Sequence, residues 1–315
     1  MSLTFLFSFI ITAAVMPLFI KWMHKKQFGQ EILEIGPSWH KEKSGTPTMG
    51  GLVFLTATVL SMVVSHWWLG SFSPEIFILV ITLIMFGLLG FVDDFLKIFK
   101  KQNEGLTAKQ KFLAQLGMAL VIVLLIKGFG VNAYLPLPFH LGTSHFILLL
   151  VFSVIWLTGF SNAFNLTDGI DGLSSGCAIL TLTGYLILFL RQGNVEVSLF
   201  IVGLIGSLFA FLIFNMKKAK VFMGDAGALA VGALMAVLSI MSGNPWSLLL
   251  FGLIYVLETA SVMLQVAYFK RTHKRIFKMT PIHHHFEMSG WSEWKIDFVF
   301  WEITGVLMIV GLIAF

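Results

Sequence analysis

Ten apolar segments, each close to the length of about 20 residues that a bilayer crossing needs, limit what this chain can fold into. Apolar residues make up 57% of its 315 positions and charged residues only 12%, which is far from the composition of soluble domains. We therefore predict an all-α integral membrane protein with about ten transmembrane helices, forming one polytopic domain over residues 1–315. The segments lie at about 3–20, 51–69, 76–98, 112–126, 146–164, 174–190, 197–214, 222–241, 247–268 and 298–315.

Basic residues are concentrated in alternate loops. The loops at 21–50, 95–111, 215–221 and 269–297 hold all 21 lysines and arginines except Lys127 and Arg191. The positive-inside rule places these loops in the cytoplasm, and an even number of crossings then places both termini outside. The net charge of +5 is therefore a signal of topology. Binding of nucleic acid is not expected, because the lysines are spread over short loops without an aromatic stacking platform.

The loop at 162–173 is unusually polar for its position between two apolar segments. Its four polar side chains recur every third residue, so consecutive helical or 3₁₀-like turns could present them on one face. Gly169 and Gly172 allow a close backbone approach. Helix capping could explain one or two of these side chains, but four exceed what capping needs, so we expect a functional site. The four are Asn162, Asn165, Asp168 and Asp171.

Three further acidic residues lie at the ends of two segments. Asp93 and Asp94 close the third segment, and adjacent helical residues point about 100° apart, so we do not expect both to ligate one ion equally. Asp94 and Lys97 could form a charged stripe with Lys101, or simply a solvated helix end. Asp225 opens the eighth segment between glycines, where a carboxylate suits a hard cation or merely complements the helix dipole.

Two other segments have the composition of a phosphate site. Residues 43–51 combine Lys43 with hydroxyls and glycines, but the lysine precedes the glycines, unlike a Walker A loop. Residues 281–287 contain three consecutive histidines, which cannot all face one ion, so donation to phosphate oxygens fits better than a zinc site. Glu258 lies inside the ninth segment, and we assign it no chemistry. Carboxylates, basic groups and an apolar wall together indicate transfer between a soluble phosphate donor and a lipid acceptor.

Five motifs between about Lys43 and Trp301 carry a family resemblance. They are K-S-G-T-P-T-M-G-G, D-D-F-L-K, N-A-F-N-L-T-D-G-I-D-G-L, F-M-G-D-A-G and P-I-H-H-H-F-E. In these the chain resembles the bacterial phospho-N-acetylmuramoyl-pentapeptide transferases (translocase I) of the polyprenyl-phosphate hexose-1-phosphate transferase superfamily. Ala228 replaces a serine that is usual in the family, and Val299 stands where an arginine is frequent. Neither change removes a carboxylate, lysine or histidine of the motifs.

The resemblance implies a dimeric enzyme of ten helices in the bacterial cytoplasmic membrane, with its active site facing the cytoplasm. It implies Mg²⁺-dependent transfer of phospho-MurNAc-pentapeptide from UDP-MurNAc-pentapeptide to undecaprenyl phosphate, giving lipid I and UMP. It also implies which residues act. The catalytic residues would be Asp93, Asp94, Asp225 and His284, with Asp225 as the metal ligand. Substrate would be bound by Lys43, Thr48, Lys97, Lys109, Asn165, Asp168, Asp171, Asn215, Phe222, His283 and His285.

The sequence leaves several alternatives open. Asp93 or Asp94 could deprotonate the lipid phosphate, or an aspartate could form a covalent intermediate. A relative that transfers another UDP-amino-sugar is the nearest rival function. A cation-coupled transporter is a more distant one, because transporters place their acidic residues near the membrane midplane. The third residue of the pentapeptide and the dimer interface cannot be read from the sequence.

Overall fold

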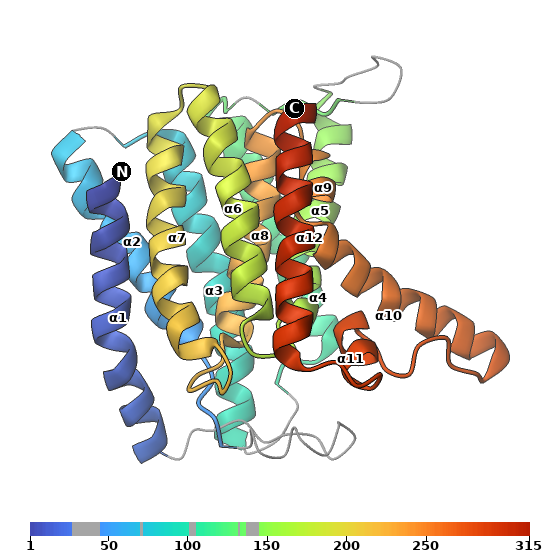
Figure 1. The fold of residues 1–315 in the computed structure, drawn as a ribbon. Helices are drawn as coiled ribbons and strands as arrows, with labels where there is room; N and C mark the ends of the chain where they lie inside the picture. The colour runs from blue at the N-terminus through green and yellow to red at the C-terminus, as the bar shows by residue number, and fades with distance from the viewer. Residues whose placement is uncertain (27–44, 70–71, 101–104, 132, 137–144) are drawn as a thin grey trace.

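The computed structural model describes residues 1–26, 45–69, 72–100, 105–131, 133–136 and 145–315. Within these ranges the chain folds into a bundle of helices (Figure 1). Their bounds are α1 Ser2–Lys25, α2 Gly50–Leu69, α3 Pro74–Lys100, α4 Ala108–Gly128, α5 Phe146–Thr167, α6 Leu173–Arg191, α7 Val195–Asn215, α8 Gly224–Met241, α9 Ser247–Phe251, α10 Leu253–Thr272, α11 Ile282–Glu287 and α12 Glu293–Ala314.

The predicted all-α membrane architecture is confirmed. Among the described residues, 9 helices are long and apolar enough to cross a membrane, and Gly50–Ser65 within α2 is a shorter apolar helix. One prediction needs correction, because the segment expected at 247–268 is two helices, α9 and α10. They are separated at Gly252, where a Cβ atom would lie 2.8 Å from the Tyr255 ring and 2.9 Å from the Leu248 carbonyl oxygen.

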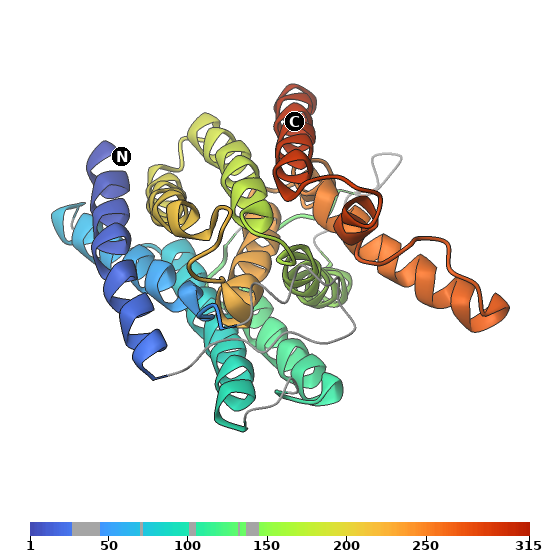
Figure 2. The same ribbon diagram turned by 60° about the horizontal axis from the view of Figure 1, so that its bottom comes forward.

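The candidate site residues come from one end of the bundle. Both termini lie at the upper end in Figure 1, whereas the α5–α6 and α7–α8 turns and the short helix α11 lie at the lower end. Figure 2 brings this loop end forward. An even number of crossings predicts this arrangement. That the loop end faces the cytoplasm stays a prediction from the distribution of lysine and arginine.

Helix α8 packs against α2, α3 and α5 and is the most central element. Small residues make this possible, because without side-chain bulk neighbouring backbones approach closely, as is common between membrane helices. A Cβ atom on Gly90 of α3 would lie only 2.1 Å from the Asp225 carbonyl oxygen, and one on Gly232 of α8 only 2.4 Å from the Phe160 carbonyl oxygen. The first of these close approaches brings the start of α8 onto the end of α3.

Turns with specific local chemistry define the ends of the helices near the site. Thr107 and Gln110 form a capping box at the start of α4, in which each side chain satisfies a free backbone N–H group of the other residue. Gly172 precedes α6 with a φ angle of 84°, and Gly224 is the first residue of α8 with a φ angle of 74°. Glycine adopts this left-handed region at no steric cost. Helix α10 differs from the others in leaning away from the bundle (Figure 1).

Candidate active site

Three aspartates from two helices form the centre of the site. One carboxylate oxygen from each of Asp93, Asp94 and Asp225 lies within 4.8 Å of the other two. Asp93 and Asp94 are 2% and 3% exposed, so their charges need partners or a metal ion. An oxygen-only donor set of this kind fits a hard divalent cation such as Mg²⁺. Among the described residues this is the one such group of possible metal ligands.

Two lysines neutralise part of this negative charge. The Lys97 ammonium lies 2.6 Å from Asp93, 3.0 Å from Asp225 and 3.7 Å from Asp94. The Lys111 ammonium of α4 lies 2.7 Å from Asp225 and 4.0 Å from Asp93. Each lysine therefore contacts at least two of the acids, and together the five groups join α3, α4 and α8.

Asp93 and Asp94 lie close enough to contact one ion, and the expectation that they would not ligate it equally stays a prediction. Asp93 Oδ1 accepts a hydrogen bond from the backbone N–H of Leu106 at 2.9 Å, and Asp94 Oδ2 accepts one from Ala226 at 3.2 Å. The first bond ties Asp93 to the segment before α4, and the second ties Asp94 to the first turn of α8, beside Asp225. The tight packing at Gly90 brings that turn within reach, which the helical angle alone could not reveal.

Sequence reasoning missed Lys111 and selected Lys109 instead. Lys109 is exposed in the first turn of α4, and its role in binding stays a prediction. A signal for Lys111 was available, because it precedes the buried residues Gln115 and Ala119 by one and two helical turns on the same face. Of the stripe of Asp94, Lys97 and Lys101, the Asp94–Lys97 pair is present at 3.7 Å, although Lys97 lies closer to Asp93, and Lys101 falls outside the described residues.

The segment before α2 packs against the start of α8. The Phe222 N–H group donates to the Pro47 carbonyl at 2.8 Å, and Gly50 N–H donates to the Phe222 carbonyl at 2.9 Å. Thr48 is 6% exposed, and a Cβ atom on Gly224 would lie 2.8 Å from its hydroxyl and 2.5 Å from Asp94 Oδ2. Thr48 therefore lies beside the aspartates. Lys43, at the start of the same motif, falls outside the described residues.

The four polar side chains at 162–171 do not share one face, because α5 ends at Thr167. Asn162 forms a reciprocal amide pair with Gln115 of α4, with N···O distances of 2.8 and 3.3 Å. Asn165 is partly exposed on the last turn of α5. Asp168 accepts a hydrogen bond from the Ser174 hydroxyl at 2.5 Å, and Asp171 accepts one from the Ala219 N–H at 2.9 Å. Asn162 is thus a link between helices.

Asn215 connects this loop to the α7–α8 turn. Its side-chain oxygen accepts from the Gly172 N–H and the Ser175 hydroxyl, both at 3.1 Å. Its amide nitrogen donates to the Val221 carbonyl at 3.1 Å. The side chain is 2% exposed. In this structure Asn215 therefore joins the α5–α6 turn to the α7–α8 turn.

Asp168 has an unusual charge environment. Burial raises the pKa of its carboxyl to about 6, opposed by the Ser174 hydrogen bond and the His283 charge and reinforced by the charges of Asp225 and Asp171. A carboxyl in this position changes its protonation state close to physiological pH. The same interactions show that Asp168 lies within electrostatic range of the aspartate cluster and of the histidines.

The three histidines lie on the short helix α11 and point to different partners. His283 Nδ1 lies 3.1 Å from Glu258, and His284 Nδ1 lies 2.6 Å from Glu287. His285 Nδ1 accepts a hydrogen bond from the Lys278 N–H at 3.2 Å. Each ring therefore lies beside a different group. Both glutamates are visible in the sequence, Glu258 without an assigned role and Glu287 at the end of the histidine motif, but the sequence does not predict these pairs.

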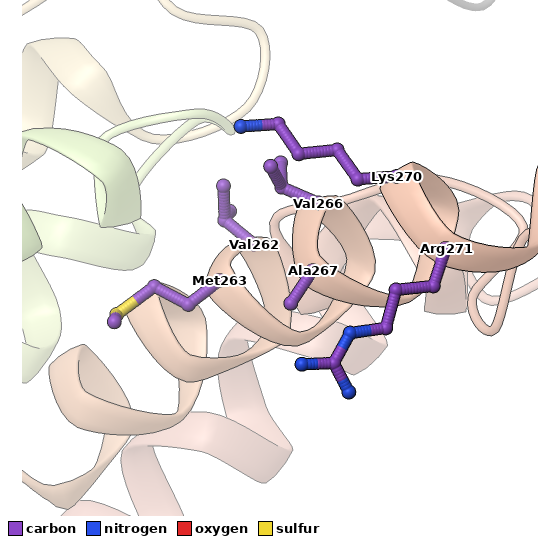
Figure 3. A pocket seen from close by; sticks show the side chains of 6 residues that line it. All are labelled: Val262, Met263, Val266, Ala267, Lys270 and Arg271. Atoms are coloured by element: carbon purple, nitrogen blue, oxygen red, sulfur yellow. The ribbon is translucent and has the colours of Figure 1, made fainter.

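A groove lies along α10. Figure 3 shows its lining, which is apolar along most of its length and cationic at the end. Apolar stems with charged ends are typical of side chains at a membrane interface. The lining residues are Val262, Met263, Val266, Ala267, Lys270 and Arg271.

Comparison with known sequences agrees with this geometry. The sequence model for glycosyl transferase family 4 matches residues 76–243, which include all three aspartates. Signature 1 of the phospho-N-acetylmuramoyl-pentapeptide-transferases matches residues 43–55, the segment that contains Thr48.

Proteins named phospho-N-acetylmuramoyl-pentapeptide-transferase are similar along nearly the whole chain. The protein of Latilactobacillus sakei subsp. sakei is 51% identical over 309 residues, covering 98% of this chain and 96% of its own length. That of Lactobacillus helveticus is 49% identical, covering 98% and 93%, and that of Enterococcus hirae is 49% identical, covering 96% and 94%. The chain therefore belongs to the phospho-N-acetylmuramoyl-pentapeptide-transferase family.

Proposed function

We propose that this protein transfers phospho-MurNAc-pentapeptide from UDP-MurNAc-pentapeptide to undecaprenyl phosphate, releasing UMP and forming lipid I. The observation that carries the proposal is the buried cluster of Asp93, Asp94 and Asp225 at the loop end of a membrane bundle. Such a cluster suits a reaction between a water-soluble diphosphate and a lipid phosphate. The distribution of lysine and arginine supports a cytoplasmic orientation of this end in a bacterial cell membrane.

The aspartate cluster would hold Mg²⁺, with Asp225 as its main ligand and Asp93 and Asp94 beside it. When bound, the ion supplies positive charge that neutralises the donor diphosphate and stabilises the departing UMP. Lys97 and Lys111 already contact the acids. We propose that they turn toward phosphate oxygens when substrates arrive.

In the reaction an oxygen of the lipid phosphate attacks the phosphorus that carries the sugar. The bond between that phosphorus and the UMP oxygen breaks, and a new diphosphate forms. Asp93 or Asp94 would accept the proton of a monoprotonated lipid phosphate, whose second pKa is about 6. An aspartyl intermediate is the competing route, and trapping a labelled phospho-enzyme in a single turnover would distinguish the two.

The donor would lie between the α5–α6 turn, the α7–α8 turn and the histidine helix. Asp168 and the histidines can hydrogen-bond sugar and nucleotide groups, and Asp171 and Asn215 fix the turns. The predicted contacts of the donor are Lys43, Thr48, Lys97, Lys109, Asn165, Asp168, Asp171, Asn215, Phe222, His283, His284 and His285.

The groove on α10 fits the acceptor. Its apolar lining suits a polyprenyl chain, and Lys270 and Arg271 at its end suit a phosphate head group. Helix α10 also leans out of the bundle (Figure 1), which leaves this face open to lipid.

We also propose that the enzyme acts as a homodimer, as its resemblance to the family implies. Apolar side chains such as Ile10 of α1 and Val306 of α12 are exposed and can meet either lipid or a second copy. Mass measurement of the detergent-solubilised protein would decide between a monomer and a dimer.

Release of UMP from UDP-MurNAc-pentapeptide by purified protein tests the function. We expect release that needs both undecaprenyl phosphate and Mg²⁺. Faster release from another UDP-amino-sugar would favour the nearest rival function. Absence of release from any donor, together with cation-driven solute uptake into vesicles, would favour a transporter.

A further inference from the structure

Glu258 is a buried acid that the proposed reaction does not use. It lies within α10, one of the membrane-spanning helices, and is 0% exposed. A carboxylate in such a place is costly and is usually held by a specific partner. Its partner here is His283, whose Nδ1 atom lies 3.1 Å from Glu258 Oε1 and whose backbone N–H donates to Oε2 at 3.4 Å. Glu258 therefore hydrogen-bonds the backbone of His283 and lies beside its ring, although the Nδ1 and Oε1 atoms do not have hydrogen-bond geometry.

His283 in turn lies against the α5–α6 turn. Its side chain is 0% exposed, and a Cβ atom on Gly169 would lie 2.3 Å from His283 Nε2 and 2.7 Å from Cε1. Among the described residues neither ring nitrogen of His283 has a hydrogen-bond partner. A chain of contacts thus runs from Glu258 on α10 through His283 on α11 to Gly169 in the α5–α6 turn.

The carboxylate lies on the Nδ1 side of the His283 ring, the place that a carboxylate takes beside many functional histidines. Nε2 faces the loop. His284 repeats the arrangement with Glu287, and its ring centroid lies 4.1 Å from that of His283. Movement of His283 would therefore also move His284.

We propose that Glu258 is a positioning residue for the transfer reaction. Its carboxylate fixes the ring of His283, and through it the position of the histidine helix relative to the Asp168–Gly169 turn where the donor binds. The inference rests on the proposed function. It predicts that Glu258 affects use of the donor, although it lies in a helix whose outer face we assign to the lipid.

Steady-state kinetics of Glu258→Gln test the proposal. We expect kcat/KM for UDP-MurNAc-pentapeptide to fall about 10- to 100-fold, the range for carboxylates that orient metal-bound histidines. The KM for undecaprenyl phosphate and the Mg²⁺ concentration for half-maximal rate should not change, and Glu258→Asp should restore part of the loss. Ser261→Ala is the matched control, because Ser261 is 3% exposed on the same helix and donates only to the Glu258 carbonyl.

A double-mutant cycle identifies the route of the effect. If Glu258 acts through His283, Glu258→Gln should change kcat/KM less than about 2-fold when His283 is already alanine. An undiminished effect in that background, or wild-type kinetics in the single variant, would overturn the proposal. A change confined to the KM of the lipid would do so as well.

A second variant covers the case in which Glu258→Gln does not fold. Gly169→Ala places a methyl group against His283 Nε2, so it should raise the KM of the donor in the same way, and an unchanged donor KM would contradict the proposal. Wild-type activity separates the two levels of inference. Failure of the wild type to release UMP refutes the proposed function. If the wild type is active but the effects of Glu258→Gln and His283→Ala on kcat/KM are additive, only the positioning role is refuted.

Discussion

At the scale of single residues, Asp225 is the most informative position to change. It pairs with lysines from two different helices and belongs to the candidate metal site. Asp225→Asn keeps the shape but removes the charge, so we expect a roughly 10²-fold loss of UMP release. Mg²⁺ should raise the Tm of the wild-type protein and leave that of the variant unchanged. Near-normal turnover with normal Mg²⁺ dependence would exclude Asp225 as the main ligand.

Asp168 should give donor binding a pH dependence. Because burial raises the pKa of its carboxyl to about 6, the group is charged above this pH and becomes neutral below it. We expect the KM for the donor to rise as pH falls through 6, by up to about 10-fold per unit, and this rise should vanish in Asp168→Asn. Donor KM is the measurement to use, because the lipid phosphate itself titrates near pH 6 and affects turnover. A rise that persists in the variant would assign the titration to another group.

At the scale of helices, the approach of α3 to α8 is the contact that assembles the aspartates. Gly90→Ala should force these helices apart, because the new methyl group would lie 2.1 Å from the Asp225 carbonyl oxygen. We expect a destabilisation of about 1–3 kcal/mol and a larger loss of activity than of Tm. Gly117→Ala on α4 is the control, since nothing lies within 4 Å of its added atom. Equal behaviour of the two variants would show that this packing does not set the site.

The groove on helix α10 should determine how tightly the enzyme binds the acceptor lipid. Replacing Lys270 and Arg271 with glutamine removes the cationic end of its groove. We expect a higher KM for undecaprenyl phosphate and an unchanged KM for the donor, measured with mixed micelles at several lipid fractions.

The variant His284→Ala should raise the KM for the donor and leave the KM for undecaprenyl phosphate unchanged. Identical kinetic changes in both variants would mean that the groove and the histidine helix do not serve separate substrates.

At the scale of the whole molecule, the orientation in the membrane can be tested with cysteine reporters. The single native cysteine, Cys177, is buried and should give little background. A membrane-impermeant maleimide applied to intact bacteria should label Gln192→Cys but not Lys274→Cys, because these exposed positions lie in loops assigned to opposite sides. Permeabilised cells should label both. The opposite pattern would place the aspartates outside the cell.

Much of the architecture could be predicted because it depends on local composition. A run of apolar residues buries its backbone polar groups only as a helix when it lies in lipid, so the sequence predicts most of the membrane helices and their approximate positions. The one misjudged segment, 247–268, is broken at Gly252 into α9 and α10. The motifs could likewise be recognised residue by residue.

By itself, then, the sequence determined the all-α membrane architecture, the family and a set of candidate acids, lysines and histidines. Only the tertiary structure decided which of these groups meet. Lys111 rather than Lys109 reaches Asp225 because one helical face of α4 lies against α8. Asn162 became a link to Gln115, and Glu258 a support for His283. Such pairs join residues far apart in the chain, and their distances depend on how closely neighbouring helices pack, which the order of residues within one helix does not contain.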